Sequence, residues 1–199
     1  TALTMGASGD TTTVPSGASL VVASGATINI TGATQTGFPS AGFNSIQKFT
    51  SSGTWTRPTD ITKVVVFVTG GGGAGTYRSG DLGQGGGASG TAIKFLDVSS
   101  ISTSTITIGA GGAGSSASDP ANGSVGANSI WADGTNTITG VGGGIGSSTG
   151  LPGEGSTPTC APSATHDVII VGGSGGGMSD GMGGASFWGN GTNARYSGG

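Results

Sequence analysis

The sequence is poor in the side chains from which most catalytic and metal sites are built. Its 199 residues include one cysteine, one histidine and one glutamate: Cys160, His166 and Glu154. A single cysteine excludes a disulfide within the chain, and one Cys with one His argues against a zinc site. The nine acidic residues are scattered, without the evident carboxylate pair that glycoside cleavage needs. We therefore expect a protein that is not an enzyme and that binds neither metal nor cofactor.

Cations and long apolar runs are also scarce. Six Lys and Arg residues and a net charge of −3 leave no electrostatic footprint for phosphate groups, so no nucleic-acid partner is expected. No run of about 20 apolar residues is present, which excludes insertion into a membrane as a helix. Neither a starting methionine nor a signal peptide precedes Thr1, which predicts a fragment or a processed product.

Glycine is what the sequence has in excess. The chain holds 46 Gly, 27 Ser and 28 Thr, together about half of all residues. Gly, Ser and Thr are poor helix formers, which excludes a helical bundle or a coiled coil. So much glycine is typical of disorder, yet the net charge is low and several strongly apolar segments are present. We therefore expect an ordered all-β protein.

Two regions differ in their repeats. Glycines at positions 9, 17, 25 and 32 separate short stretches in which apolar and polar residues alternate. Because strands of about five residues bury little surface alone, residues 1–43 are expected to form a trimeric stem, like a β-prism or β-helix, with a junction. An ordinary meander is the alternative. Residues 1–69 hold 8 glycines and residues 70–199 hold 38, so residues 44–199 are expected to form a separate head domain.

The head begins with strand-like sequence. Residues 46–50 and 54–56 predict a hairpin around the turn at 51–53. Residues 64–68 are apolar on both faces, which predicts a central strand covered on both sides. Phe49, Trp55, Phe67 and Phe95 lie in such segments and are expected in the core.

Four apolar strands then run directly into glycine. They end near the glycines at positions 70, 109, 140 and 172, a spacing of 30 to 40 residues that is typical of repeat architectures. Consecutive glycines favour extended three-fold helices of the polyglycine II kind, which can approach one another on every side. The head is therefore expected to be a bundle of such helices anchored by β-strands. Flexible glycine loops on an ordinary sandwich are the alternative.

Three motifs mimic binding or catalytic sites but lack the required context. Gly70, Gly72 and Gly75 follow a strand with the spacing of a dinucleotide fingerprint, but no helix former follows. Residues 172–180 contain only one Asp, too few for calcium-binding repeats. Adjacent His166 and Asp167 cannot form a triad with a nearby serine, and His166 is expected as a polar residue at a strand start.

A longer match is more specific. Residues 43–58 (FNSIQKFTSSGTWTRP) are followed by KVVVFVTGGGGAG at 63–75. This combination resembles the glycine-rich domain of bacteriophage tail fibres and tail-tip adhesins. The resemblance implies a homotrimeric, extracellular virion protein in the phage tail, which contacts other tail proteins and attaches to a bacterial surface receptor, a protein or a polysaccharide. The chain departs from the family pattern after Ser197, where a closing apolar strand is absent. A purely architectural fibre segment, with the receptor-binding tip elsewhere, is the alternative.

Loops that follow the glycine runs are the expected receptor surface, because exposed aromatic residues near charges are frequent anchors of recognition. These loops comprise residues 77–81, 115–122, 147–163 and 178–182. The candidate receptor-binding residues, all expected in or near loops, are Tyr77, Arg78, Asp81, Asp119, Trp131, Trp188 and Tyr196.

Overall fold

The chain divides into two units, Thr1–Ile46 and Gln47–Gly199. A computed structural model describes residues 45–76, 83–115, 123–147, 151–165, 167–177 and 182–191. The expected stem and junction at residues 1–43 therefore lie outside the described residues, and their fold stays a prediction. Everything below concerns the second unit.

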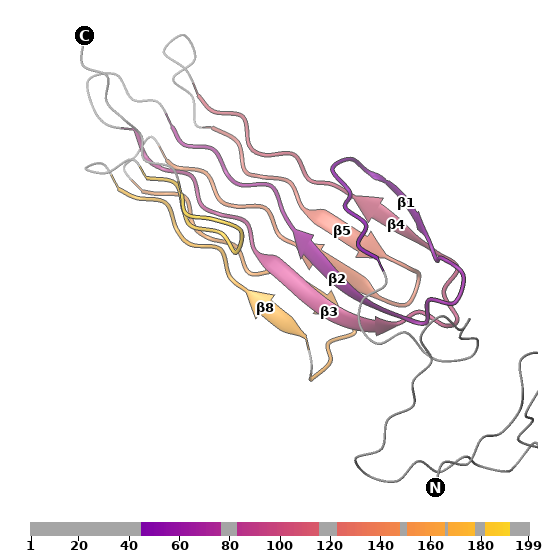
Figure 1. The fold of residues 1–199 in the computed structure, drawn as a ribbon. Helices are drawn as coiled ribbons and strands as arrows, with labels where there is room; N and C mark the ends of the chain where they lie inside the picture. The colour runs from indigo at the N-terminus through magenta and orange to yellow at the C-terminus, as the bar shows by residue number, and fades with distance from the viewer. Residues whose placement is uncertain are drawn as a thin grey trace, which may run out of the picture. The chain divides into compact units, whose positions relative to one another are not determined.

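The described residues form an all-β fold of two antiparallel sheets that do not close into a barrel (Figure 1). One sheet has five strands in the order β1-β4-β5-β6-β7, and the other has three in the order β2-β3-β8. The strands are β1 (Gly53–Thr56), β2 (Lys63–Thr69), β3 (Thr91–Asp97), β4 (Thr103–Thr107), β5 (Ser129–Ala132), β6 (Thr137–Gly140), β7 (Thr159–Ala161) and β8 (Val168–Ile170). No helix occurs in this part of the chain.

A small core lies where the two sheets face each other. Trp55 on β1 and Trp131 on β5 are each 5% exposed, and their ring centroids are 5.0 Å apart. Ile138 on β6 and Ala92 on β3 are fully buried in the same cluster. Burial of large aromatic and branched side chains is the main source of stability in so small a core.

The expected hairpin at residues 46–56 is wrong in its first half. Residues 46–50 form no strand, and Ile46 is 92% exposed. The second half is confirmed as β1, which pairs with β4 instead, placing Trp55 opposite Ser104. The physical reason is that pairing with β4 places Trp55 in the core beside Trp131, whereas a local hairpin partner would not.

The expectation that residues 64–68 form a central strand is also wrong. Among the described strands, β2 lies at the edge of its sheet and pairs with β3 alone. Val66 and Val68 are buried against the other sheet, whereas Phe67 on the opposite face is 51% exposed. Phe95 on β3 shares that outer face and is 62% exposed, so neither phenylalanine belongs to the core as expected.

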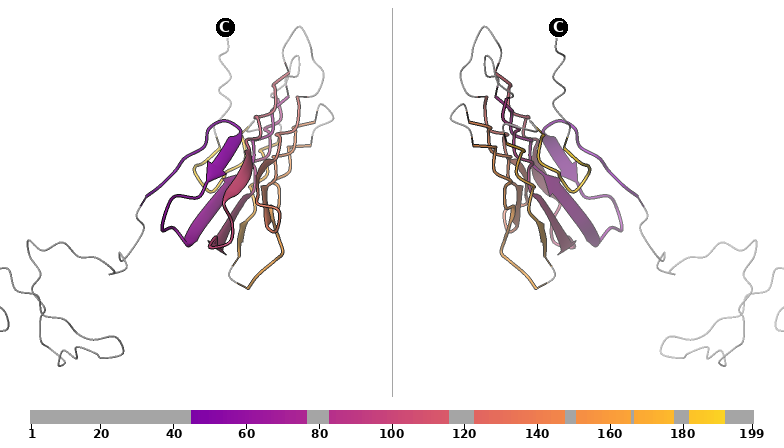
Figure 2. Two further views of the ribbon diagram at one scale, coloured as in Figure 1. Left: turned by 90° about the vertical axis from the view of Figure 1, so that its right-hand side faces the viewer. Right: turned by 90° about the vertical axis from the view of Figure 1, so that its left-hand side faces the viewer.

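Beyond the strands, the chain continues in extended segments rich in glycine that are neither helix nor strand. We call this set the glycine bundle; its segments are residues 70–76, 83–90, 109–115, 123–128, 141–147, 151–158, 171–177 and 182–191. Six of them directly follow or precede a strand, and segment 109–115 begins two residues after β4. Figures 1 and 2 show them running side by side from the ends of the strands in one direction.

Hydrogen bonds join the segments with a period of three residues. Every third residue of segment 70–76 donates its N–H to segment 83–90, in the pairs Gly70–Gly90, Gly73–Gly87 and Thr76–Gln84. The intervening Gly71 and Ala74 donate to a different segment, 123–128. The same spacing joins 171–177 to 151–158, and 141–147 to 70–76. Buried backbone polar groups are thus paired without a β-ladder.

Close approach between segments explains why glycine is needed here. A Cβ atom at Gly73 would lie within 3.0 Å of the carbonyl oxygens of Gly143 and Gly144. The same holds at Gly143, where it would meet the backbone of Gly87. Among the described glycines, only Gly134 has a φ in the left-handed region, at 88°. In the bundle it is therefore the missing side chain, more than an unusual dihedral angle, that selects glycine.

Candidate functional site

The far ends of the glycine bundle lie together, opposite the sheets. Ser147 donates its N–H to Leu151, and Gly176 donates to Met182, so two pairs of segments stay bonded up to, or one residue short of, the last described residue. Gly146 also donates to Ala74, which links two pairs to each other. The connections between paired segments therefore start and finish at one end of the bundle (Figure 1).

Most of the predicted receptor-binding residues belong to those connections or to the C-terminal end. Tyr77, Arg78, Asp81, Asp119 and Tyr196 lie outside the described residues, as does His166. Their assignment stays a prediction. Trp188 is described and is 64% exposed, in the tight turn between Ser186 and Gly189.

The loop position expected for Trp131 is wrong. Trp131 lies in β5, is 5% exposed, and packs against Trp55 in the core. Its indole N–H donates to a carboxylate oxygen of Asp133 at 3.4 Å. A receptor-binding role would require an exposed side chain, whereas the sheets bury that of Trp131. The expected loop at 147–163 is likewise too long, because residues 151–158 join the bundle and residues 159–161 form β7.

Trp188 is held at the surface by two kinds of contact. Its indole N–H donates to the hydroxyl of Thr69 at 2.7 Å, at the end of β2. The ring of Phe187 meets it edge-on at 4.7 Å between centroids, and the ring of Phe67 lies 6.1 Å away. The three rings form a group that we call the aromatic cluster: Phe67, Phe187 and Trp188. Reading the sequence missed Phe67 and Phe187; the adjacent Phe187-Trp188 pair was the available signal.

A shallow groove of about 370 Å³ opens beside the aromatic cluster. Thr69 and Ser186, both bonded to Trp188, are among the residues that line it. The rest of its lining is Gly, Ala and Ser from segments 70–76, 83–90 and 182–191, without a charged side chain. Ser89 lines the groove although its residue is only 5% exposed, and its hydroxyl makes no hydrogen bond with any described residue.

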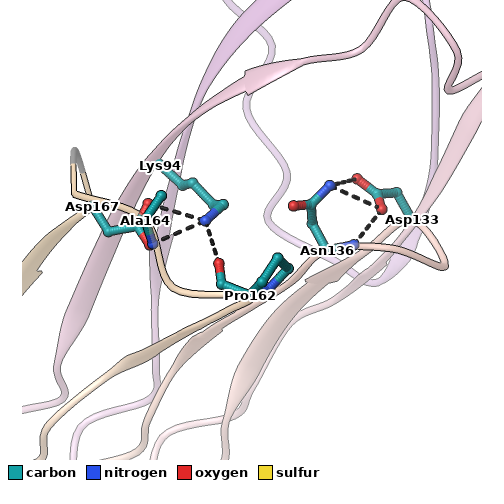
Figure 3. A network of polar contacts seen from close by, with 6 residues as sticks. All are labelled: Lys94, Asp133, Asn136, Pro162, Ala164 and Asp167. Atoms are coloured by element: carbon teal, nitrogen blue, oxygen red, sulfur yellow. Dashed lines mark hydrogen bonds and ion pairs between the residues drawn. The ribbon is translucent and has the colours of Figure 1, made fainter.

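A second polar group lies on the core side of β3. The ammonium of Lys94 lies 3.0 Å from both carboxylate oxygens of Asp167 and donates to the carbonyl of Pro162 at 2.6 Å (Figure 3). Asp167 also accepts from the N–H of Ala164. The side chains of Lys94 and Asp167 are 4% and 7% exposed, so this pair fixes the chain before β8. The one ammonium group of Lys94 thus pairs with one carboxylate, which is a structural arrangement.

Two further titratable groups have shifted pKa values. Burial raises the pKa of Asp133, but hydrogen bonds from Asn136 and Thr135 outweigh it, so the pKa lies below its ordinary value. This carboxylate organises the turn between β5 and β6. Burial, and then the charge of Asp167, raises the pKa of the Cys160 thiol, which Lys94 partly offsets.

Two other kinds of feature are absent from the described residues. These residues contain no group of three or more His, Cys, Asp or Glu residues that could hold a metal ion. They also contain no helix long and apolar enough to cross a membrane.

Comparison with known proteins gives one family match. No curated protein matches the chain. A family model described as a glycine-rich domain matches residues 44–199, which include both sheets and all segments of the bundle. Because this match spans well over half of the sequence, the chain belongs to the glycine-rich domain family.

Proposed function

We propose that this protein is a phage tail fibre that attaches the virion to the bacterial surface through its glycine-rich head. The observation that carries the proposal is the gathering of the connections at one end of the bundle. A rigid scaffold that presents variable connections at one end is a common way to build a recognition surface. The resemblance of residues 43–75 to tail-fibre domains supports the same proposal.

We also propose that the bundle segments are polyglycine II-like helices. A three-residue hydrogen-bond period and residues that donate in turn to different neighbours are what packed three-fold extended helices require. A network of this kind holds the connections without a large apolar core. It supplies rigidity through backbone pairing between segments.

The proposed assembly is a homotrimer joined through residues 1–43, located in the extracellular virion, in contact with other tail proteins. Several heads on one fibre convert weak contacts into firm attachment, because each further contact is made at a high effective concentration. We propose no catalytic step. A trimer predicts a mass in solution of about 56 kDa, against 18.6 kDa for one chain.

Binding of the labelled 199-residue chain to a panel of whole bacterial cells tests attachment. Saturable binding to some strains, competed by unlabelled chain, is the expected result. Absence of binding to every strain, with the trimer intact, would instead favour an architectural fibre segment. Release of sugar from purified envelopes would contradict the non-enzymatic role.

A further inference from the structure

We propose that the groove beside the aromatic cluster is a binding subsite for a neutral saccharide. The inference rests on the proposed attachment function and names a ligand class for it. The site lies at the strand ends, on the side of the bundle, and is separate from the connections. The groove is lined by Ser89 and the glycine backbone, and the exposed ring of Trp188 adjoins it through hydrogen bonds to Thr69 and Ser186, which line it too.

The exposed tryptophan supplies the apolar half of such a site. A pyranose ring has one face of C–H groups and an edge of hydroxyls, so it needs a flat apolar surface next to polar groups. Trp188 is 64% exposed, and its only ring N–H is already donated to Thr69, which leaves the face of the ring available. Phe187 packs edge-on against it and limits its rotation. A pre-set aromatic ring loses little conformational entropy on binding.

The groove supplies the polar half. Ser89 lines the groove, and its hydroxyl has no hydrogen-bond partner among the described residues, so it is open to a ligand. Gly72 offers open space, since a Cβ added there would have nothing within 4 Å. Glycine lining lets a ligand approach the backbone closely enough for hydrogen bonds to N–H and C=O groups. These are the donors and acceptors that sugar hydroxyls match.

Charge decides between a saccharide and other ring-bearing ligands. No lining residue of the groove is charged, and the chain as a whole carries a net charge of −3. A nucleotide or an acidic polysaccharide would bring negative charge without a cation to receive it. A neutral hexose chain meets no such cost. The structure therefore favours neutral over anionic sugars.

Intrinsic fluorescence gives a direct test on the full chain. The sequence has three tryptophans, of which Trp55 and Trp131 are buried, so a change in emission on titration reports Trp188. The probes are neutral hexose oligosaccharides prepared from bacterial envelopes, with carboxylated oligosaccharides and a proline-rich peptide for comparison. We expect saturable quenching or a blue shift with at least one neutral probe, and weaker binding of the charged ones.

Variants locate the site. Trp188→Ala should weaken binding of the neutral probe at least tenfold, measured by calorimetry, and Ser89→Ala by about three- to tenfold, the range of one hydrogen bond. Phe95→Ala is the matched control, because Phe95 on β3 is about as exposed as Trp188 but makes no ring contact with it; binding should not change. Equal binding by Trp188→Ala, no response to any neutral probe, or preference for the peptide would overturn the proposal.

Whole-cell binding separates this inference from the proposed function. If cells bind the wild type and Trp188→Ala equally, attachment stands and the groove proposal fails. If the wild type binds no cells but binds the neutral probe through Trp188, the groove stands and the attachment function fails.

Discussion

Lys94 and Asp167 form an ion pair across 73 residues of sequence, with 3.0 Å between the ammonium nitrogen and each carboxylate oxygen. Both side chains are more than nine-tenths buried. Lys94→Met would leave the carboxylate buried without its partner, which typically costs about 3–5 kcal/mol of unfolding free energy. Urea unfolding at neutral pH measures this loss.

The double variant Lys94→Met with Asp167→Asn is its control. It removes both charges and keeps an acceptor for the N–H of Ala164, so it should lose clearly less than the single variant. An unfolding midpoint of Lys94→Met equal to that of the wild type would show that the pair is not buried in solution.

Gly73→Ala should destabilise the head, by about 1–3 kcal/mol or more, because the new Cβ would overlap two backbone carbonyl oxygens. Gly72→Ala is the neighbouring control, with open space at its Cβ; we expect a change within about 0.5 kcal/mol. Thermal unfolding of the two variants side by side provides the measurement. Equal effects at the two positions would contradict the close packing of the bundle.

Trp131→Ala should cost about 3–5 kcal/mol, since it removes one ring of the tilted tryptophan pair in the core. Trp188→Ala should cost much less, because its ring is mostly exposed. Guanidinium unfolding followed by circular dichroism compares them. A larger loss for Trp188→Ala would reverse the assignment of core and surface.

Stability should depend on the protonation of Asp133 at low pH. Its pKa is lower in the folded state than the ordinary 3.8, so its contribution is present above that value and is lost as pH falls through the folded pKa. Asp133→Asn should therefore reduce stability at pH 7 by about 1 kcal/mol or less, and the difference should shrink below about pH 4. Thermal midpoints between pH 2 and 7 test this; a constant difference would contradict it.

The sequence predicts the strands better than their partners. Apolar runs locate β2, β6 and β8 to within a residue or two, because a strand's side-chain pattern is local. Pairing is not local: β1 pairs with β4, 47 or more residues away, and nothing in residues 46–56 specifies that choice. For the same reason, the apolar sequence around Phe67 does not tell which face of its sheet is covered by the other sheet.

The candidate site divides in the same way. Trp188 is expected in or near a loop, and it does lie in a turn, whereas its receptor-binding role stays a prediction. Trp131 was misplaced because the four-residue β5 is too short to show alternation. Ser89 could not be predicted as a site residue, since the groove that it lines exists only where segment 182–191 lies beside segment 83–90. The Lys94–Asp167 pair needs β3 and β8 to be neighbours before it can be recognised.

The three-residue spacing of the backbone bonds restricts how such a head can change in length. Inserting one residue within a segment would turn every donor beyond it by about a third of a turn, towards the wrong neighbour. In the proposed polyglycine II-like geometry, insertions of three, matched in both segments of a pair, would restore every partner and move the connection outward by about 9 Å at a rise near 3.1 Å per residue. Lengths in the bundle are therefore quantised, whereas the connections are free to vary by any number of residues.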